Sequence, residues 1–492
     1  MSDTRTLQEH INHLLSTRFG INQCYPYQQL VIMNILEEDA PKNQLVILPT
    51  GYGKSLCFMV PGLIQDGITL IIYPLLSLMN DQLRRFKEIG ANAVCLKGGQ
   101  TAGHRKELYT RISDLKNAFI LTTPETLQTK SVQSQLQQLS IVHIVVDEAH
   151  IVSTWGKTFR PAYGTLGTTL RGFSDVQLTA FTATATPDTI KDIRHLLFLD
   201  RPLHIIQGNI DRPNIFYRTL PTLAKIHDLY ILLTQTHIQR PTLVFCGRRD
   251  ITEHLAMTFR IRLHSQEIFY YHAGMSSTSR SYVENWFNSS TDGVLFATTA
   301  FGLGIDKADV RTVIHYQISQ TVEAFLQESG RAGRDRRSAL SLSLFYPQEL
   351  QDPKMPPDLI RFLADQQTCR RVALFHTFKQ EISSCFGCDV CNTCVIDLPD
   401  GEKEILDLIR HHPLQLSTSV AARILYGKAS IEMRQKKLTT YWGFGMLSSW
   451  ELDDIEQAIR TLIDNHRLYV KTHPTRAAVI YLPRQKRYHG QK

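Results

Sequence analysis

QLVILPTGYGKSLC, residues 44–57, joins an apolar strand to a glycine turn and then to the start of a helix. Gly51 and Gly53 shape the turn, and Lys54 and Ser55 follow it directly. This order points backbone N–H groups and a helix N-terminus at an anion, with the lysine able to reach outer phosphates and the serine hydroxyl able to hold Mg²⁺. The segment thus predicts a nucleotide-binding loop. A strand-to-helix turn whose lysine is only a solvated surface charge is the alternative.

Apolar runs of the same kind recur along the chain and form two series. The first includes ITLIIYP (68–74), IVHIVVDEAH (141–150) and VQLTAFTAT (176–184), and the second includes PTLVFCGRR (241–249), RTVIHYQIS (311–319) and ALSLSLFYP (339–347). Helical patterns separate these runs, which is typical of parallel sheets covered on both faces. We therefore expect two successive α/β domains, over residues 1–212 and 213–348.

An acidic pair ends the apolar strand in IVHIVVDEAH. A phosphate site needs such a pair, because one carboxylate can hold Mg²⁺ and the other can act on water. Asp147 would take the metal, directly or through water, and Glu148 would orient or deprotonate the attacking water. A solvated acidic loop at a strand end is the alternative for such a pair taken alone.

The stretch QESGRAGRDRR, residues 327–337, places Arg331 and Arg334 three positions apart after glycines that permit close backbone approach. Phosphoryl transfer gains from a guanidinium brought to the developing negative charge, and an arginine supplied across a cleft makes hydrolysis depend on closure. A basic helix that faces solvent is the alternative.

Composition limits the class of protein further. The chain has 492 residues, 43% of them hydrophobic and 20% charged, and its net charge of +8 fits a polyanionic partner. Since no apolar run approaches the roughly 18 residues that span a bilayer, we expect no membrane role. The N-terminal residues are too polar for a signal peptide, so we expect a cytoplasmic protein.

Five cysteines gather in one short segment that follows a proline-rich joint near residue 350. Cys369 lies on an expected helix, and Cys385, Cys388 and Cys391 follow at CxxCxxC spacing, which suits a tetrahedral Cys₄ zinc site. Cys394 is an additional thiol that could replace one of the four. Redox chemistry by a CxxC pair is the alternative, although no thioredoxin-like context surrounds it.

Several of these stretches resemble, in order, the motifs of a superfamily 2 helicase. They are TGYGKS (50–55), DEAH (147–150), TATAT (182–186), ATTAFGLGIDKADVR (297–311) and QESGRAGR (327–334). Within that superfamily the stretch DEAHIVSTWGKTFRPAYGTLG, residues 147–167, resembles the aromatic-rich loop of the RecQ DNA helicases. The resemblance extends over residues 8–485 and is to the short RecQ type, similar to bacterial RecS, which lacks the further C-terminal helical domain.

This resemblance implies an architecture. Two tandem RecA-like parallel-sheet domains would be followed by a helical Cys₄ zinc module over residues 349–398. A winged-helix domain over residues 399–492 would complete the chain, with a β-hairpin and a basic tail. The zinc ligands of the family match Cys369, Cys385, Cys388 and Cys391.

The resemblance also implies a nucleotide site. The family loop does not use the first glycine of the strict phosphate-loop pattern, so Leu48 at that position is expected, and Lys54 becomes the phosphate lysine. YPYQQ, residues 25–29, resembles the adenine-recognising element, in which Gln28 suits a purine edge. The family usually has arginine where Tyr25 stands and glycine where Tyr27 stands, so Tyr25 could stack on the base instead. The expected nucleotide contacts are therefore Tyr25, Gln28, Thr50, Gly51, Gly53, Lys54 and Ser55, with Ser55 and Asp147 also holding Mg²⁺.

The expected DNA contacts rest on the resemblance as well. Trp155 and Phe159 would stack on a single strand, Arg160 would add charge, and His150 would help report DNA occupancy to Glu148. A buried aromatic pair is the alternative for the two rings. The hairpin expected around THPTR, residues 472–476, could place His473 or Arg476 at a duplex fork, whereas a solvated turn is the alternative.

By resemblance, the chain is an ATP-dependent 3′-to-5′ DNA helicase of recombination and repair that uses ATP, Mg²⁺ and Zn²⁺. Its partners would be single-stranded DNA and duplex junctions, with a single-strand-binding protein as a candidate partner, and we expect a monomer. Two other interpretations are an RNA-remodelling ATPase, since DEAH also occurs in RNA helicases, and a non-catalytic DNA-binding module built on a decayed motor. The intact Lys54, Asp147 and Glu148 argue against the second.

Overall fold

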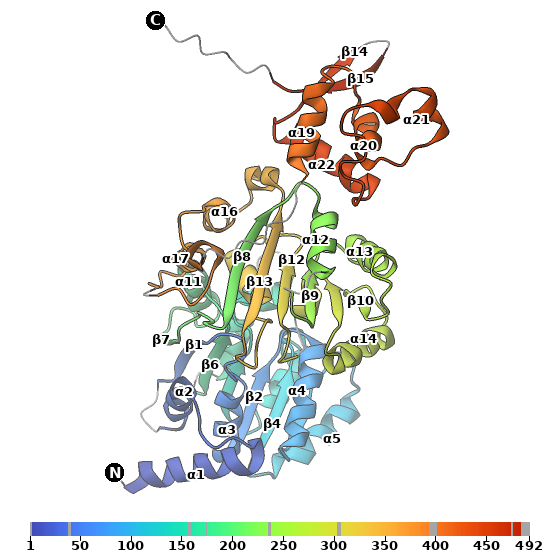
Figure 1. The fold of residues 1–492 in the computed structure, drawn as a ribbon. Helices are drawn as coiled ribbons and strands as arrows, with labels where there is room; N and C mark the ends of the chain where they lie inside the picture. The colour runs from blue at the N-terminus through green and yellow to red at the C-terminus, as the bar shows by residue number, and fades with distance from the viewer. Residues whose placement is uncertain are drawn as a thin grey trace, which may run out of the picture.

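The computed structural model describes residues 2–37, 41–154, 160–173, 175–234, 238–302, 307–382, 384–392, 401–473 and 476–483. Figure 1 shows three parts stacked from bottom to top: a first sheet with its helices, a second sheet with its helices, and a C-terminal group of helices with a hairpin. No helix in these ranges is long and apolar enough to cross a membrane.

The first part contains a parallel sheet. Its elements are α1 (Ser2–Phe19), α2 (Pro26–Leu36), β1 (Asn43–Ile47), α3 (Leu56–Ile64), β2 (Gly67–Ile72), α4 (Leu76–Glu88), β3 (Ala93–Cys95), α5 (Ala102–Ser113), β4 (Asn117–Thr122), α6 (Pro124–Leu127), α7 (Lys130–Leu136), β5 (Ile141–Val146), α8 (Ile151–Thr154), α9 (Pro161–Gly164), α10 (Leu166–Thr169), the 3₁₀ helix η1 (Leu170–Phe173), β6 (Gln177–Thr182), α11 (Pro187–Leu196) and β7 (His204–Gln207). Among the described residues the strand order is β3-β4-β2-β5-β6-β1-β7, with every pairing parallel.

Both faces of this sheet are covered, which explains why its strands are almost continuously apolar. Successive side chains of a strand point to opposite faces. Val46 packs against α2, α3 and α4, whereas Leu45 and Ile47 pack on the other face against α5, α7 and α11. The sheet order makes β5, β6 and β1 neighbours although they are far apart in sequence. Because parallel strands end at the same edge, the segments after these three strands meet there.

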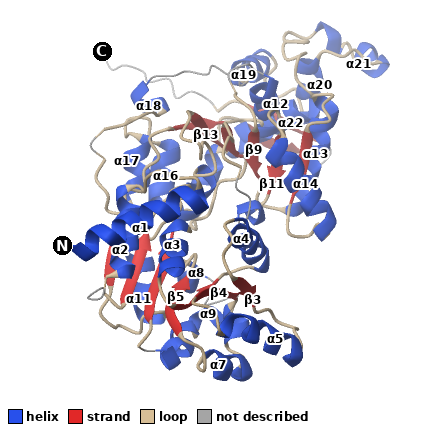
Figure 2. Cartoon of the chain, turned by 90° about the horizontal axis from the view of Figure 1, so that it is seen from below, coloured by secondary structure: helices blue, strands red, loops and turns tan. Residues whose placement is uncertain are grey.

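The second part repeats this plan. Its elements are β8 (Ile215–Pro221), α12 (Lys225–Thr234), β9 (Thr242–Phe245), α13 (Arg249–Arg262), β10 (Ile268–Tyr271), α14 (Ser277–Ser289), β11 (Val294–Ala297), the 3₁₀ helix η2 (Thr299–Gly302), β12 (Thr312–His315), α15 (Val322–Ser329) and β13 (Ala339–Phe345). Within the described ranges the strand order is β10-β11-β9-β12-β13-β8, again with parallel pairings. The expected pair of RecA-like sheets is confirmed; Figure 2 shows the two sheets from below, as separate lobes.

The cysteine-bearing segment lies on one face of the second sheet. Its elements are the 3₁₀ helix η3 (Pro347–Gln351), α16 (Pro357–Ala364), α17 (Arg370–His376) and α18 (Asp389–Asn392). Phe362 and Leu374 belong to the same apolar core as Leu243 and Phe245 of β9. The segment therefore does not fold around a core of its own, because its helices complete that of the second sheet.

The C-terminal part has its own core. Its elements are α19 (Glu402–His411), α20 (Thr418–Tyr426), α21 (Ile431–Gln435), the 3₁₀ helix η4 (Leu438–Thr440), α22 (Leu452–Asp464), β14 (Tyr469–His473) and β15 (Arg476–Tyr481). The strands pair antiparallel with His473 opposite Arg476, so the expected hairpin is present. Four α-helices, a 3₁₀ helix and a hairpin thus make up the described residues of this part, as expected of a winged-helix domain. This part docks on α12, where the His227 and Trp450 rings stack at 3.6 Å between centroids.

Candidate functional site

The phosphate loop, residues 50–55, follows β1 and has the backbone shape that its glycines predict. Gly51 and Gly53 have φ angles of +82° and +66°, in the left-handed region that favours glycine. Lys54 Nζ donates to the carbonyl of Leu48 at 3.3 Å, and α3 begins directly after Ser55. The loop, the lysine and the helix N-terminus thus form the anion-binding arrangement expected of this segment.

The Gln28 side chain is buried against this loop. Its Nε2 donates to the carbonyls of Tyr52 at 2.9 Å and Gly53 at 3.4 Å, while its Oε1 accepts from the Tyr25 N–H at 2.9 Å. Gln28 therefore links the start of α2 to the loop backbone. The Tyr25 ring lies under the guanidinium of Arg336, with 4.2 Å from Cζ to the ring centroid, so a residue of the second part already covers the expected base-stacking ring.

The acidic pair follows β5, at the same sheet edge as the phosphate loop. The Asp147 side chain is buried, and its Oδ1 accepts from the N–H of Glu148 at 3.0 Å. Glu148 has a φ of +51°, a strained value for this residue type of the sort that gathers at functional sites. Glu148 Oε2 lies 3.3 Å from Nδ1 of His150, which also lies 3.1 Å from Thr182 Oγ1 in the TATAT segment after β6.

The two carboxyl groups differ in proton affinity. Burial raises the pKa of Asp147, and the neighbouring Glu148 raises it further against the opposing effect of Lys54. Burial acts on Glu148 in the same direction, but Lys54, His150 and Arg331 together outweigh it and lower the pKa of Glu148. The positive groups around Glu148 thus favour its ionised form, which is the form that can accept a proton. Oxygen donors such as Asp147 and Ser55 are the ligands that Mg²⁺ prefers, so these side chains fit that ion.

The second part adds side chains to the site. Arg331 is buried and lies close enough to Glu148 to affect its ionisation. Arg334 Cγ lies 3.7 Å from the position that a Cβ on Gly51 would occupy, so this side chain borders the phosphate loop. Gln327 Nε2 lies 3.3 Å from His150 Nε2. The structure thus brings Lys54 and the acidic pair of one sheet together with both predicted arginines of the other.

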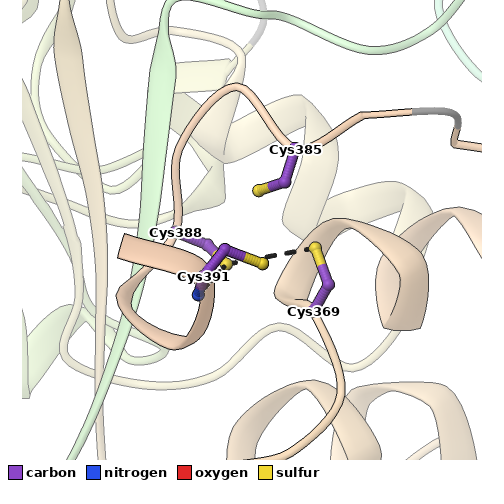
Figure 3. Close-up of side chains that lie close together, drawn as sticks. All are labelled: Cys369, Cys385, Cys388 and Cys391. Atoms are coloured by element: carbon purple, nitrogen blue, oxygen red, sulfur yellow. Dashed lines mark hydrogen bonds between the residues drawn. The ribbon is translucent and has the colours of Figure 1, made fainter. Parts of the chain in front are cut away.

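The cysteine cluster, Cys369, Cys385, Cys388 and Cys391, is a second site (Figure 3). The four sulfur atoms lie within 4.8 Å of one another, and the side chains point toward a common centre. Cys369 Sγ and Cys388 Sγ are 4.0 Å apart. Tetrahedral zinc with Zn–S bonds of about 2.3 Å needs sulfurs about 3.8 Å apart, so the cluster fits zinc. Cys394 lies outside the described residues.

Comparison with known proteins agrees with this geometry. The model of the DEAD/DEAH box helicase family matches residues 25–193, and that of the helicase conserved C-terminal domain matches residues 224–336. ATP-dependent DNA helicase RecQ of Haemophilus influenzae is 32% identical over 92% of this chain and 75% of its own length. The chain belongs to the RecQ family of ATP-dependent DNA helicases. The probable ATP-dependent DNA helicase RecS of Bacillus subtilis is 37% identical over 68% of this chain and 66% of its own length.

Solved structures support the fold. The DNA-bound DUF1998 helicase MrfA aligns with a TM-score of 0.56 and 17% identity, over 82% of this RecQ chain and 57% of its own. Helicase Lhr of Mycobacterium smegmatis, bound to single-stranded DNA and AMP-PNP, aligns with a TM-score of 0.55 and 16% identity, over 93% and 73% of the two chains.

The predicted DNA contacts of this RecQ chain are only partly visible. Trp155 and Phe159 lie outside the described residues, as do the side chains of His473 and Arg476. Arg160 Nε donates to Glu125 Oε1 at 2.7 Å, and its guanidinium also donates to the Pro74 carbonyl. This arginine therefore holds the start of α9 against the segments that follow β2 and β4. The DNA roles of these residues stay predictions.

Sequence reasoning missed three side chains that join the two halves of the site: Arg212, Gln327 and Arg336. Gln327 opens the motif QESGRAGR and could have been read as part of it. Arg212 belongs to GNIDRPNIFY, residues 208–217, which reads only as a pause between two series of strands. Its partners are backbone carbonyls, which carry no sequence signal.

Proposed function

We propose that this RecQ chain couples ATP hydrolysis to 3′-to-5′ movement on single-stranded DNA and to duplex unwinding, in recombination and repair. The observation that carries the proposal is the composite site: the phosphate loop and acidic pair belong to one sheet, and Arg331 and Arg334 belong to the other. Because the arginines reach the phosphates only when the two sheets are close together, each hydrolysis event depends on the approach of one sheet to the other.

In this proposal each residue has one task. Lys54 and the loop N–H groups bind the β- and γ-phosphates of ATP, and Ser55 and Asp147 hold Mg²⁺, which neutralises phosphate charge when bound. Glu148 accepts a proton from the attacking water. Arg331 and Arg334 stabilise the charge that develops on the γ-phosphate. Tyr25 and Gln28 lie at the base end of the loop.

Coupling to DNA would use the contacts around His150. Its Nδ1 lies 3.3 Å from Glu148 Oε2, and its Nε2 lies 3.3 Å from Gln327 of the second part. His150 is also five residues before Trp155 in the aromatic-rich loop, with the short helix α8 between them. We infer that stacking of Trp155 and Phe159 on a strand shifts His150 and thereby sets the orientation of Glu148.

Unwinding needs the free energy of ATP hydrolysis. A base-pair step costs about 1.4 kcal/mol to open, so ten steps need roughly 14 kcal/mol. The hairpin of β14 and β15 is the proposed wedge, with His473 or Arg476 at the terminal base pair.

We further propose that the chain is a monomer and that it acts in the cytoplasm on single-stranded DNA and duplex junctions, with a single-strand-binding protein as a partner. The proposed domain limits lie at residues 212, 348 and 398.

The experiment is unwinding of a short labelled duplex that carries either a 3′ or a 5′ single-stranded tail, with ATP and Mg²⁺. Lys54→Ala is the blank. Opening of only the 3′-tailed duplex, lost in the variant, supports helicase activity, its polarity and the phosphate loop together. Opening of the 5′-tailed duplex alone would refute the polarity, and DNA-stimulated hydrolysis without unwinding would remove the wedge role.

A comparison of DNA with RNA tests the partner. DNA and RNA oligomers of equal length and matched sequence are added to the wild-type chain, and the rate of ATP hydrolysis is measured. We expect stimulation by DNA only. Equal stimulation by RNA would favour an RNA-remodelling ATPase.

A further inference from the structure

Arg212 lies in the linker between the two sheets and is buried, with 6% of its surface exposed. Its Nη1 donates to the carbonyls of Thr50 at 3.2 Å and Gly330 at 3.1 Å. Its Nη2 donates to the carbonyls of Ala332 at 3.3 Å and Gly333 at 2.6 Å. Thr50 opens the phosphate loop, while the other three carbonyls belong to residues 330–334, here called the arginine turn. One guanidinium therefore bonds to both halves of the composite site.

The chemistry of these contacts requires arginine. Four carbonyls are reached by a planar fork that offers five N–H donors in fixed directions. A lysine ammonium has three donors at one point and cannot reach the Thr50 carbonyl and the three carbonyls of the arginine turn in this way. The linker reinforces the same turn through Asn214, whose Nδ2 donates to the carbonyls of Gly333 and Arg337, both at 2.8 Å.

The arginine turn has little freedom of its own. Gly333 has a φ of +54°, and a Cβ there would lie 2.5 Å from Asn214 Nδ2. Arg331 and Arg334 project from this turn, and the Arg212 Nη1 and Arg334 Cγ atoms both lie 3.7 Å from the Cβ position of Gly51. The backbone to which Arg212 donates its hydrogen bonds thus places both predicted catalytic arginines beside the phosphate loop.

An ion pair between Arg371 and Asp211 holds the linker itself. The fully buried Arg371 pairs with Asp211, next to Arg212, and also donates to the carbonyls of Ile215 and Arg212. Arg371 lies two residues after Cys369, so the cysteine cluster and the linker are packed as one unit. The Asp211–Arg371 pair consequently fixes the backbone position from which the Arg212 side chain extends.

We propose that Arg212 is a positioning residue for ATP hydrolysis: it holds the arginine turn against the phosphate loop, from a linker that Arg371 and Asp211 anchor to the cysteine-bearing segment. This proposal rests on the proposed ATPase site. It adds a residue that acts through backbone carbonyls, those of Thr50 and of the arginine turn.

The test measures ATP hydrolysis in the presence of single-stranded DNA by Arg212→Lys and Arg331→Ala, alone and combined, with Arg201→Lys as the matched control. Arg201 also donates to a carbonyl, that of Phe198 at 3.0 Å, but within the first part. We expect Arg212→Lys to lower kcat about 10- to 100-fold with KM for ATP changed less than about threefold, because a misplaced catalytic group loses rate rather than binding. The double variant should lose less than the product of the two single losses, because the displaced turn carries Arg331 as well as Arg334.

A merely structural role predicts something else: additive losses in the double variant, or a lower melting temperature with unchanged kcat per folded molecule, and either result overturns the proposal. Should Arg212→Lys fail to fold, Asn214→Ala is the second variant, since it removes one bond to the turn, at Gly333, and one to Arg337 just after it. It must likewise lower kcat while leaving KM for ATP nearly unchanged. A wild-type chain that hydrolyses no ATP overturns this proposal and the proposed function together. A chain that hydrolyses ATP without unwinding refutes only the proposed function.

Discussion

A methyl group added at Gly53 tests how the Gln28 side chain shapes the phosphate loop. The Cβ of Gly53→Ala would stand 2.6 Å from Gln28 Nε2, which real structures do not tolerate. Gln28 must then move and lose its 2.9 Å bond to the Tyr52 carbonyl, at a cost of about 1 kcal/mol. The φ of +66° adds about 1 to 2 kcal/mol of left-handed strain. The loop conformation should be destabilised by about 2 to 3 kcal/mol in total.

This free energy corresponds to about 30- to 150-fold weaker ATP binding, since 1.4 kcal/mol is tenfold in affinity. Gly51→Ala is the matched control. Its φ of +82° brings the same strain, but the nearest atoms to its Cβ lie at 3.7 Å. The control should therefore lose only about 5- to 30-fold.

The affinity of both glycine variants for a fluorescent ATP analogue is measured by titration, together with their KM for ATP. Each variant is made in the wild-type chain and in a Gln28→Ala chain. Removal of Gln28 should reduce the extra effect at Gly53 to that of strain alone, while leaving the effect at Gly51 unchanged. Equal losses at the two glycines, or no relief in the Gln28→Ala background, would refute the assigned role of Gln28.

Three further predictions concern catalysis, acid stability and metal. Glu148→Gln should retain ATP-analogue binding but lower kcat about 10²- to 10⁴-fold, as loss of a general base does; unchanged turnover would show that Glu148 is not the base. Burial lowers the pKa of His143 to about 3. Because the unfolded residue titrates near 6.5, the folded state should lose up to about 1.4 kcal/mol per pH unit as the pH falls from there, and His143→Gln should make acid unfolding shallower; superimposable acid-unfolding curves would contradict this. Cys388→Ser should abolish zinc retention, measured by metal analysis, and lower the melting temperature, whereas Cys24→Ser, far from the cluster, should do neither; full zinc content in Cys388→Ser would refute the site.

Much of the local structure could be predicted because it depends on neighbours in sequence. The glycine turn before Lys54, the acidic pair after β5 and the CxxCxxC spacing each need only adjacent residues to define their geometry, and the structure has all three. The sequence does not indicate the short strand β7, just before residue 208, or the start of β8, which lies in GNIDRPNIFY, residues 208–217, between the two series of strands. Four residues of β7 carry too little periodicity to stand out.

The sequence by itself determined the parts: two series of buried strands, a loop for phosphate, a carboxylate pair, an arginine pair and a cysteine cluster. Each of these is specified by residue types at short spacing. Only the tertiary structure decided how the parts meet. Backbone carbonyls accept the bonds of Gln28 and Arg212, and any residue can supply a carbonyl, so these contacts leave no trace in the sequence. The cysteine-bearing segment likewise reads as a separate module, yet its apolar side chains fill the core of the second sheet, a non-local choice that hydrophobic burial makes only when the whole chain is folded.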